Sequence, residues 1–163
     1  MKQVRWFPGK HAALFAALAV GVGCFAQAVN VLHFNPPPPL RAKIGTTVEA
    51  KVPLSLMEGY HVNSNTPSDD YLIPLQLTWT KGALESAGVV YPKPRLEKYQ
   101  FSPDKPLSVF SGNFELTAKF TVPATAAPGP AAVNGKLRYQ ACNNTMCLAP
   151  KSMDVALQVD IVK

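Results

Sequence analysis

The sequence is poor in charge and contains no run of basic residues. Only 16% of its 163 residues are charged, and 16 Lys and Arg against 10 Asp and Glu give a formal net charge of +6. Three of the basic residues, Lys2, Arg5 and Lys10, lie in the first ten positions. The remaining positive charge is small and dispersed, so we expect no nucleic-acid partner.

No hydrophobic run is long enough to span a membrane. The longest, residues 12–25, has about 14 residues, whereas a membrane helix needs roughly 20. It follows the basic residues and precedes Ala26-Gln27-Ala28, a small-x-small cleavage motif. This order predicts a cleavable export signal over 1–28 and a mature domain over 29–163 without a membrane span. A retained anchor is the alternative.

The composition also lacks the signatures of disordered and fibrous chains. The apolar fraction of 47% is too high for a disordered chain, and the ten glycines have no collagen period. The length suits one domain that can bury a core without help from a metal or a disulfide.

No segment has a helical period, whereas strict alternation of apolar and polar residues is frequent. It runs over 48–56, 114–122 and 153–161, and weaker strand candidates lie at 29–34, 60–63, 74–80, 86–91 and 133–141. Period-two alternation is typical of half-buried strands in antiparallel sheets. Seven or eight short strands predict an all-β fold, an immunoglobulin-like antiparallel β-sandwich of two sheets.

Two connections are longer than a sandwich requires. Residues 64–74 carry two acids and a tyrosine, and residues 91–107 combine four prolines with three aromatic residues. Long segments without regular structure are often functional, but a solvated connector stiffened by proline is an equal interpretation.

Cysteine is scarce, and removal of the signal would remove Cys24. The remaining Cys142 and Cys147 lie five positions apart in a compartment that permits disulfides. If the preceding strand stays regular, Cys142 points outward, and the pair lies at the exposed end of a hairpin. Such a short loop would stabilise the fold by only about 2 kcal/mol. Both a structural disulfide and thiol–disulfide exchange remain open.

Other chemistry at the cysteines has little support. Zinc needs four ligands, and the mature chain adds only His33 and His61, which we interpret as ordinary strand residues. Nothing local supports a cysteine-protease pair with His61. We therefore expect no metal and no organic cofactor. A ligand site built from Tyr60, Trp79 and Tyr99 is a further alternative, although core or lid packing explains them more simply.

The segment LRYQAC at 137–142, followed by CLAP at 147–150, resembles the amino-terminal periplasmic domain of the thiol:disulfide interchange protein DsbD. Residues 58–64 (EGYHVNS) are similar to a glycine–aromatic–histidine strand of that family, and 71–74 (YLIP) to its next segment. The resemblance covers roughly 30–163. It implies an immunoglobulin-like fold, a periplasmic location and protein-disulfide reductase chemistry.

The resemblance also implies roles for individual residues. Cys142 and Cys147 match the family's redox pair, with Cys147 as the exchanging sulfur and Cys142 as the resolving one. The segment between residues 93 and 110 matches a cap loop that shields the pair, with Phe101 and then Tyr99 as the shielding aromatic. Neighbours of the pair would be Tyr60 and Tyr139, and candidates for the family's acidic residues are Glu97 and Asp104.

The implied partners are thioredoxin-like periplasmic proteins and a membrane-embedded electron donor. Because the sequence ends at Lys163, we expect a stand-alone domain that receives electrons in trans. The alternative function is a non-catalytic secreted β-sandwich that binds a partner and uses the disulfide as a structural staple.

Overall fold

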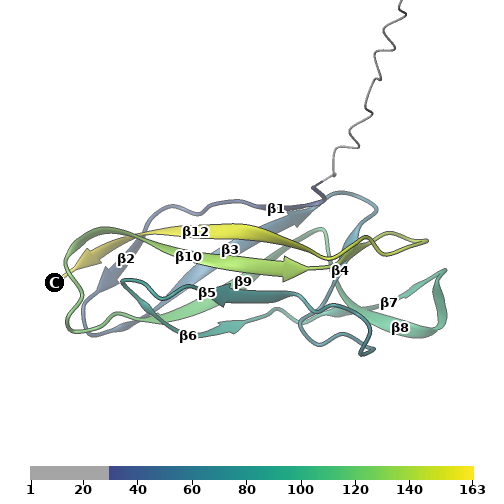
Figure 1. Cartoon of the computed structure of the whole chain (residues 1–163), viewed down its shortest axis with the longest axis horizontal. Helices are drawn as coiled ribbons and strands as arrows, with labels where there is room; N and C mark the ends of the chain where they lie inside the picture. The colour runs from purple at the N-terminus through teal and green to yellow at the C-terminus, as the bar shows by residue number, and fades with distance from the viewer. Residues whose placement is uncertain (1–29) are drawn as a thin grey trace, which may run out of the picture.

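The computed structural model describes residues 30–163, and the predicted export signal lies outside this range (Figure 1). Residues 30–163 form twelve strands and no helix. This part of the chain accordingly has no helix that is long and apolar enough to cross a membrane.

The twelve strands vary in length from two to twelve residues. Their bounds are β1 Leu32–Phe34, β2 Leu40–Lys43, β3 Thr47–Leu56, β4 His61–Asn63, β5 Gln76–Trp79, β6 Glu85–Val90, β7 Arg95–Tyr99, β8 Ser102–Ser111, β9 Asn113–Thr121, β10 Gly129–Tyr139, β11 Ala141–Cys142 and β12 Lys151–Val162.

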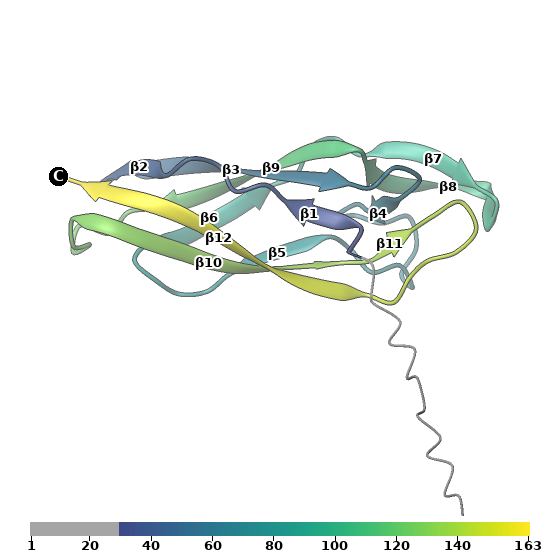
Figure 2. The ribbon, with the colours of Figure 1, turned by 90° about the horizontal axis from the view of Figure 1, so that it is seen from above.

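The strands form three four-stranded sheets. The first has the order β1-β3-β9-β6 and the second β2-β12-β10-β5. These two sheets lie face to face and form the sandwich body, as the view from above shows (Figure 2). The third sheet, of order β11-β4-β8-β7, lies at one end of the molecule, and we call this region the disulfide end (Figure 2).

The core of the sandwich body follows from the alternation in the sequence. Leu54 and Phe120 point inward from the first sheet, and Leu137 and Leu157 from the second, and all four are at most 2% exposed. The rings of Trp79 and Phe120 meet edge to face across the two sheets, 5.0 Å apart. Burial of each such side chain stabilises the fold by about 1.5–3 kcal/mol.

The predicted fold class is confirmed, with one exception to the antiparallel pairing. The three strictly alternating segments correspond to β3, β9 and β12, and the weaker candidates contain β1, β4, β5 and most of β6 and β10. The sequence pattern missed β2, which follows four consecutive prolines and pairs with β12 in parallel.

The prediction of an irregular connection at 91–107 is wrong. This segment contains β7 and more than half of β8, which form a hairpin at the disulfide end. Proline is tolerated there because Pro103 and Pro106 lie where the β7–β8 register shifts, between the Tyr99–Ser102 and Glu97–Leu107 pairs, and β4 pairs only with residues 109–111. Residues 64–74, by contrast, contain no strand, as expected.

Candidate functional site

Cys142 and Cys147 form a disulfide at the end of the molecule. The S–S distance is 2.03 Å and the Cα atoms are 3.9 Å apart. The two residues are directly opposed in an isolated antiparallel bridge. Cys142 is fully buried and Cys147 only partly, so Cys147 is the more accessible of the two residues. The predicted exposure of Cys142 is therefore wrong.

Gln140 anchors the segment that leads into Cys142. It interrupts the strand between β10 and β11, and its side-chain oxygen accepts hydrogen bonds from Asn63 Nδ2 and the Ile73 backbone N–H, each 3.1 Å long. Its amide donates to the Leu148 carbonyl at 3.3 Å. Gln140 keeps the outward parity of Arg138, and Ala141 is buried as the alternation predicts. Cys142 is buried as well, opposite the buried His61 of β4.

The four residues between the cysteines form a compact turn. Asn143 Oδ1 accepts hydrogen bonds from the backbone N–H groups of Thr145 and Met146, both at 2.9 Å, and from the Thr145 hydroxyl. The Asn143 N–H donates to the Met146 carbonyl. Such Asx bonding holds a turn without help from the rest of the fold, and here it leaves Met146 exposed beside Cys147.

A row of four residues crosses the disulfide end. Cys147 opposes Cys142, Cys142 opposes His61 on β4, and His61 opposes Ser111 on β8. Residues directly opposed in antiparallel strands project from the same face, with Cβ atoms roughly 4.5–5.5 Å apart. The row therefore leads from the partly exposed Cys147, through the buried Cys142, to the buried imidazole of His61.

Three roughly parallel rings meet at His61 of this row, and we call these three rings the aromatic stack. The rings of His61 and Tyr99 are 3.8 Å apart, with 16° between their planes. The Phe101 ring is 5.7 Å from that of Tyr99 and 6.5 Å from that of His61. Tyr99 ends β7 and Phe101 lies in the β7–β8 turn, so the residues predicted as a cap lie on a hairpin that contacts the residue opposite Cys142.

Burial shapes the electrostatics of the stack. His61 is 2% exposed, its Nε2 has no hydrogen-bond partner, and burial lowers its pKa to about 4 against the opposing charge of Glu97. The Tyr99 hydroxyl donates a 2.6 Å hydrogen bond to Glu97 Oε2. Burial, this bond and the Glu97 charge raise the pKa of Tyr99. At neutral pH the stack therefore contains a neutral imidazole and a neutral phenol.

The remaining predicted site residues have other surroundings. Tyr60 and Tyr139 belong to the main hydrophobic core rather than to the aromatic stack, and burial raises the pKa of Tyr139. Of the two acidic candidates, Glu97 bonds Tyr99 and approaches Ser111 at 3.5 Å, whereas Asp104 is exposed on β8. Within residues 30–163, no group of three or more His, Cys, Asp or Glu residues could hold a metal ion.

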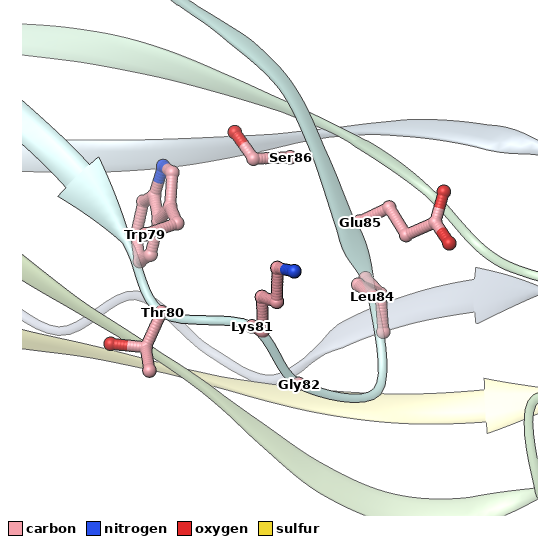
Figure 3. Close-up of a pocket in the computed structure, with 7 residues that line it drawn as sticks. All are labelled: Trp79, Thr80, Lys81, Gly82, Leu84, Glu85 and Ser86. Atoms are coloured by element: carbon pink, nitrogen blue, oxygen red, sulfur yellow. The ribbon is translucent and has the colours of Figure 1, made fainter.

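Trp79 lies in a different part of the molecule. It lines a pocket of about 450 Å³ beside the β5–β6 connection, and Figure 3 shows its indole facing the Lys81 and Ser86 side chains. The indole packs flat on Gly135, where a Cβ atom would lie 2.6 Å from Trp79 Cε3. Neither Tyr60 nor Tyr99 lines this pocket, so the structure does not bring the three aromatics into one site.

His61 is the site residue that sequence reasoning missed. We interpreted it as an ordinary strand residue because local alternation says nothing about which strand lies beside it. Its position depends on pairing between the short strands β4 and β11, which are far apart in the sequence. The available signal was the Gly59-Tyr60-His61 motif.

Comparison with known proteins gives a family match. The family model for the N-terminal domain of the thiol:disulfide interchange protein DsbD matches residues 34–158. No curated protein matches the sequence significantly.

The comparison also found two solved structures. The N-terminal periplasmic domain of ScsB from Proteus mirabilis has 13% identity and a TM-score of 0.53, over 81% of this chain and 52% of that one. This chain therefore spans about half the length of the ScsB domain. The reduced N-terminal domain of DsbD from Neisseria meningitidis has 14% identity and a TM-score of 0.45, over 68% of this chain and 76% of that one.

Proposed function

The chain belongs to the family of DsbD N-terminal domains, and we propose that it is a thiol:disulfide exchange module that works through Cys142 and Cys147. The observation that carries the proposal is the graded burial of the pair, with a partly exposed Cys147 bonded to a fully buried Cys142. The disulfide closes a short loop in a domain that already has a large apolar core, so it has little value as a staple.

The difference in burial between the two cysteines supports a separate role for each. In the reduced protein, the Cys147 thiolate attacks one sulfur of a partner disulfide, which forms a mixed disulfide and releases the partner's other sulfur as a thiolate. Cys142 then attacks Cys147 Sγ, which restores the Cys142–Cys147 bond and releases the second partner thiol. Two electrons and two protons pass to the partner, and the reverse sequence would reduce this domain.

The aromatic stack supplies a lid for this chemistry. Tyr99 and Phe101 lie on a hairpin that contacts the row from the β7–β8 side. An apolar cover slows attack by unintended thiols until a partner displaces it. We include Tyr99 and Phe101 in the proposed site for this reason.

The proposed partners follow from the family. The domain would receive electrons from a membrane-embedded donor and pass them to thioredoxin-like proteins in the periplasm. The fold similarity to a periplasmic domain of ScsB is consistent with this location.

Trapping in cells tests the proposal. A Cys142→Ala variant keeps Cys147 but cannot resolve a mixed disulfide, so it should accumulate a covalent adduct with a thioredoxin-like protein. Non-reducing electrophoresis and mass spectrometry would identify the adduct and the Cys147 linkage. The matched control, Cys147→Ala, should form far less adduct because the remaining Cys142 is buried.

The same experiment separates exchange from a structural staple. Absence of any Cys147 adduct from a well-exported Cys142→Ala variant would contradict the proposal and favour a non-catalytic sandwich with a structural disulfide.

A further inference from the structure

His61 presents a buried polar atom that the fold leaves without a partner. The residue is only 2% exposed, and its Nε2 is inaccessible to solvent and makes no hydrogen bond. More than 90% of buried polar groups in proteins are paired, and an unpaired one costs about 1–3 kcal/mol. The residue directly opposite this imidazole is Cys142, in an adjacent strand of the same sheet.

We propose that His61 accepts the proton of the Cys142 thiol when Cys142 attacks the mixed disulfide at Cys147. This inference rests on the proposed exchange function and adds a base to it. In the disulfide form Cys142 Sγ carries no proton that it could donate to His61. The unpaired Nε2 of His61 agrees with this state of the protein.

The step needs a base because Cys142 is fully buried. Burial in apolar surroundings raises the pKa of a thiol, while only the thiolate attacks a disulfide. Proton transfer from Cys142 Sγ to His61 Nε2 forms the nucleophile. The thiolate then bonds to Cys147 Sγ, the partner sulfur leaves with the electron pair of the broken bond, and the imidazolium returns the proton to that sulfur or to water.

The groups around His61 fit a proton acceptor. From β11 it faces Cys142, from β8 Ser111, and from the β7–β8 hairpin Tyr99 and Glu97. The imidazole is neutral at pH 7 because burial lowers its pKa to about 4, so a nitrogen lone pair is available. The same burial makes the imidazole a weak base, so the proton transfer depends on neighbouring charges that stabilise the imidazolium. Once the proton has moved, the Cys142 thiolate and the Glu97 carboxylate both stabilise the imidazolium.

The other polar groups of the stack are less suited to this role. The Tyr99 hydroxyl already donates to Glu97 and its pKa is raised, so it stays protonated. Glu97 is engaged with Tyr99 and approaches Ser111, which is on the far side of His61 from Cys142. His61 is thus the titratable residue directly adjacent to Cys142 in the row.

The test separates the two steps of exchange. The reduced full chain is mixed with excess oxidised glutathione, quenched with acid at successive times, and analysed by mass spectrometry for the reduced, mixed-disulfide and oxidised forms. The variant His61→Phe keeps a ring that can stack on Tyr99 but has no nitrogen. The control His33→Phe makes the same change at an exposed histidine of β1.

We expect the His61→Phe variant to form the mixed disulfide at the wild-type rate and to resolve it about 100-fold more slowly at pH 7. The deficit should shrink as the pH rises, because hydroxide then deprotonates Cys142 without help. A purely structural role for His61 would not produce this dependence on pH. His33→Phe should match the wild type in both steps.

A second variant guards against misfolding. If His61→Phe fails to give the wild-type circular dichroism spectrum, His61→Gln, which has no basic nitrogen, is measured instead and should show the same slow resolution. Wild-type resolution rates in a folded variant would overturn the role of His61 alone. A wild-type protein that forms no mixed disulfide at all would instead overturn the proposed function.

Discussion

The sandwich body and the disulfide end are built from the same kind of strand but differ in what they bury. In the sandwich body, the strands contribute to an apolar core whose residues run along the chain from Val31 to Ile161. At the disulfide end, strands of two and three residues bury polar side chains as well. The four buried polar residues of the described chain, His61, Asn63, Ser64 and Ser108, all lie on or beside β4 and β8.

The difference shows where specific hydrogen bonding replaces apolar packing. Ser64 and Ser108 share a 2.8 Å hydrogen bond, and Asn63 bonds both Gln140 and the Ile73 carbonyl. These bonds fix short strands that have too little apolar surface to hold themselves in register. We infer that the body supplies stability and that the disulfide end supplies chemistry, so changes in one region should leave the other property largely intact.

The largest expected effect is on the stability of the body. Phe120→Ala removes a ring that is 1% exposed and packs edge-on against Trp79, so the free energy of unfolding should fall by about 3–5 kcal/mol. Urea unfolding of the oxidised protein measures this loss. The rate at which a thioredoxin reduces the disulfide of the folded variant should not change, and a large change would mean that the two regions are coupled.

The sequence predicts the sandwich body better than the disulfide end. Alternation at 48–56, 114–122 and 153–161 predicts the body because a half-buried strand has a period of two. It fails at Cys142, which has the parity of the exposed Arg138 but is fully buried opposite His61 of β4. It also fails at β8, where Pro103 and Pro106 look like strand breakers but lie in the register shift between β7 and β8.

The candidate site was predictable only in part. The cysteine pair follows from the cysteine count and the export signal, and Tyr99 and Phe101 follow from the family resemblance. The contact between His61 and Cys142 depends on the register of two very short strands, which no local pattern encodes.

The next effect, on the order of 3 kcal/mol, belongs to the disulfide end and depends on pH. The pKa of His61 is about 4 in the folded protein against 6.5 for an exposed histidine. Between these values the unfolded chain binds a proton that the folded protein does not, so the His61 contribution to stability is complete above pH 6.5 and is lost as the pH falls toward 4. Urea unfolding across this range measures it.

The matched comparison for this titration is the His61→Phe variant. Its stability should fall less steeply between pH 6.5 and 4 than that of the wild type. Parallel curves for the two proteins would show that His61 is not held neutral by burial.

The smallest expected effect is that of the disulfide on stability. Reduction of Cys142–Cys147 without any mutation should lower the free energy of unfolding by at most about 2 kcal/mol, because the loop it closes is so short. Unfolding with and without a phosphine reductant measures the difference. A loss as large as that of Phe120→Ala would mean that the disulfide is a major structural element.

The equilibrium reduction potential of the Cys142–Cys147 pair tests the central claim most directly. Equilibration of the full chain with thioredoxin of known potential, followed by alkylation and mass spectrometry, measures it. An exchange module should have a potential above about −300 mV, within the range that thioredoxin-like proteins can reduce. A potential well below about −300 mV would place the pair among structural disulfides and contradict the account.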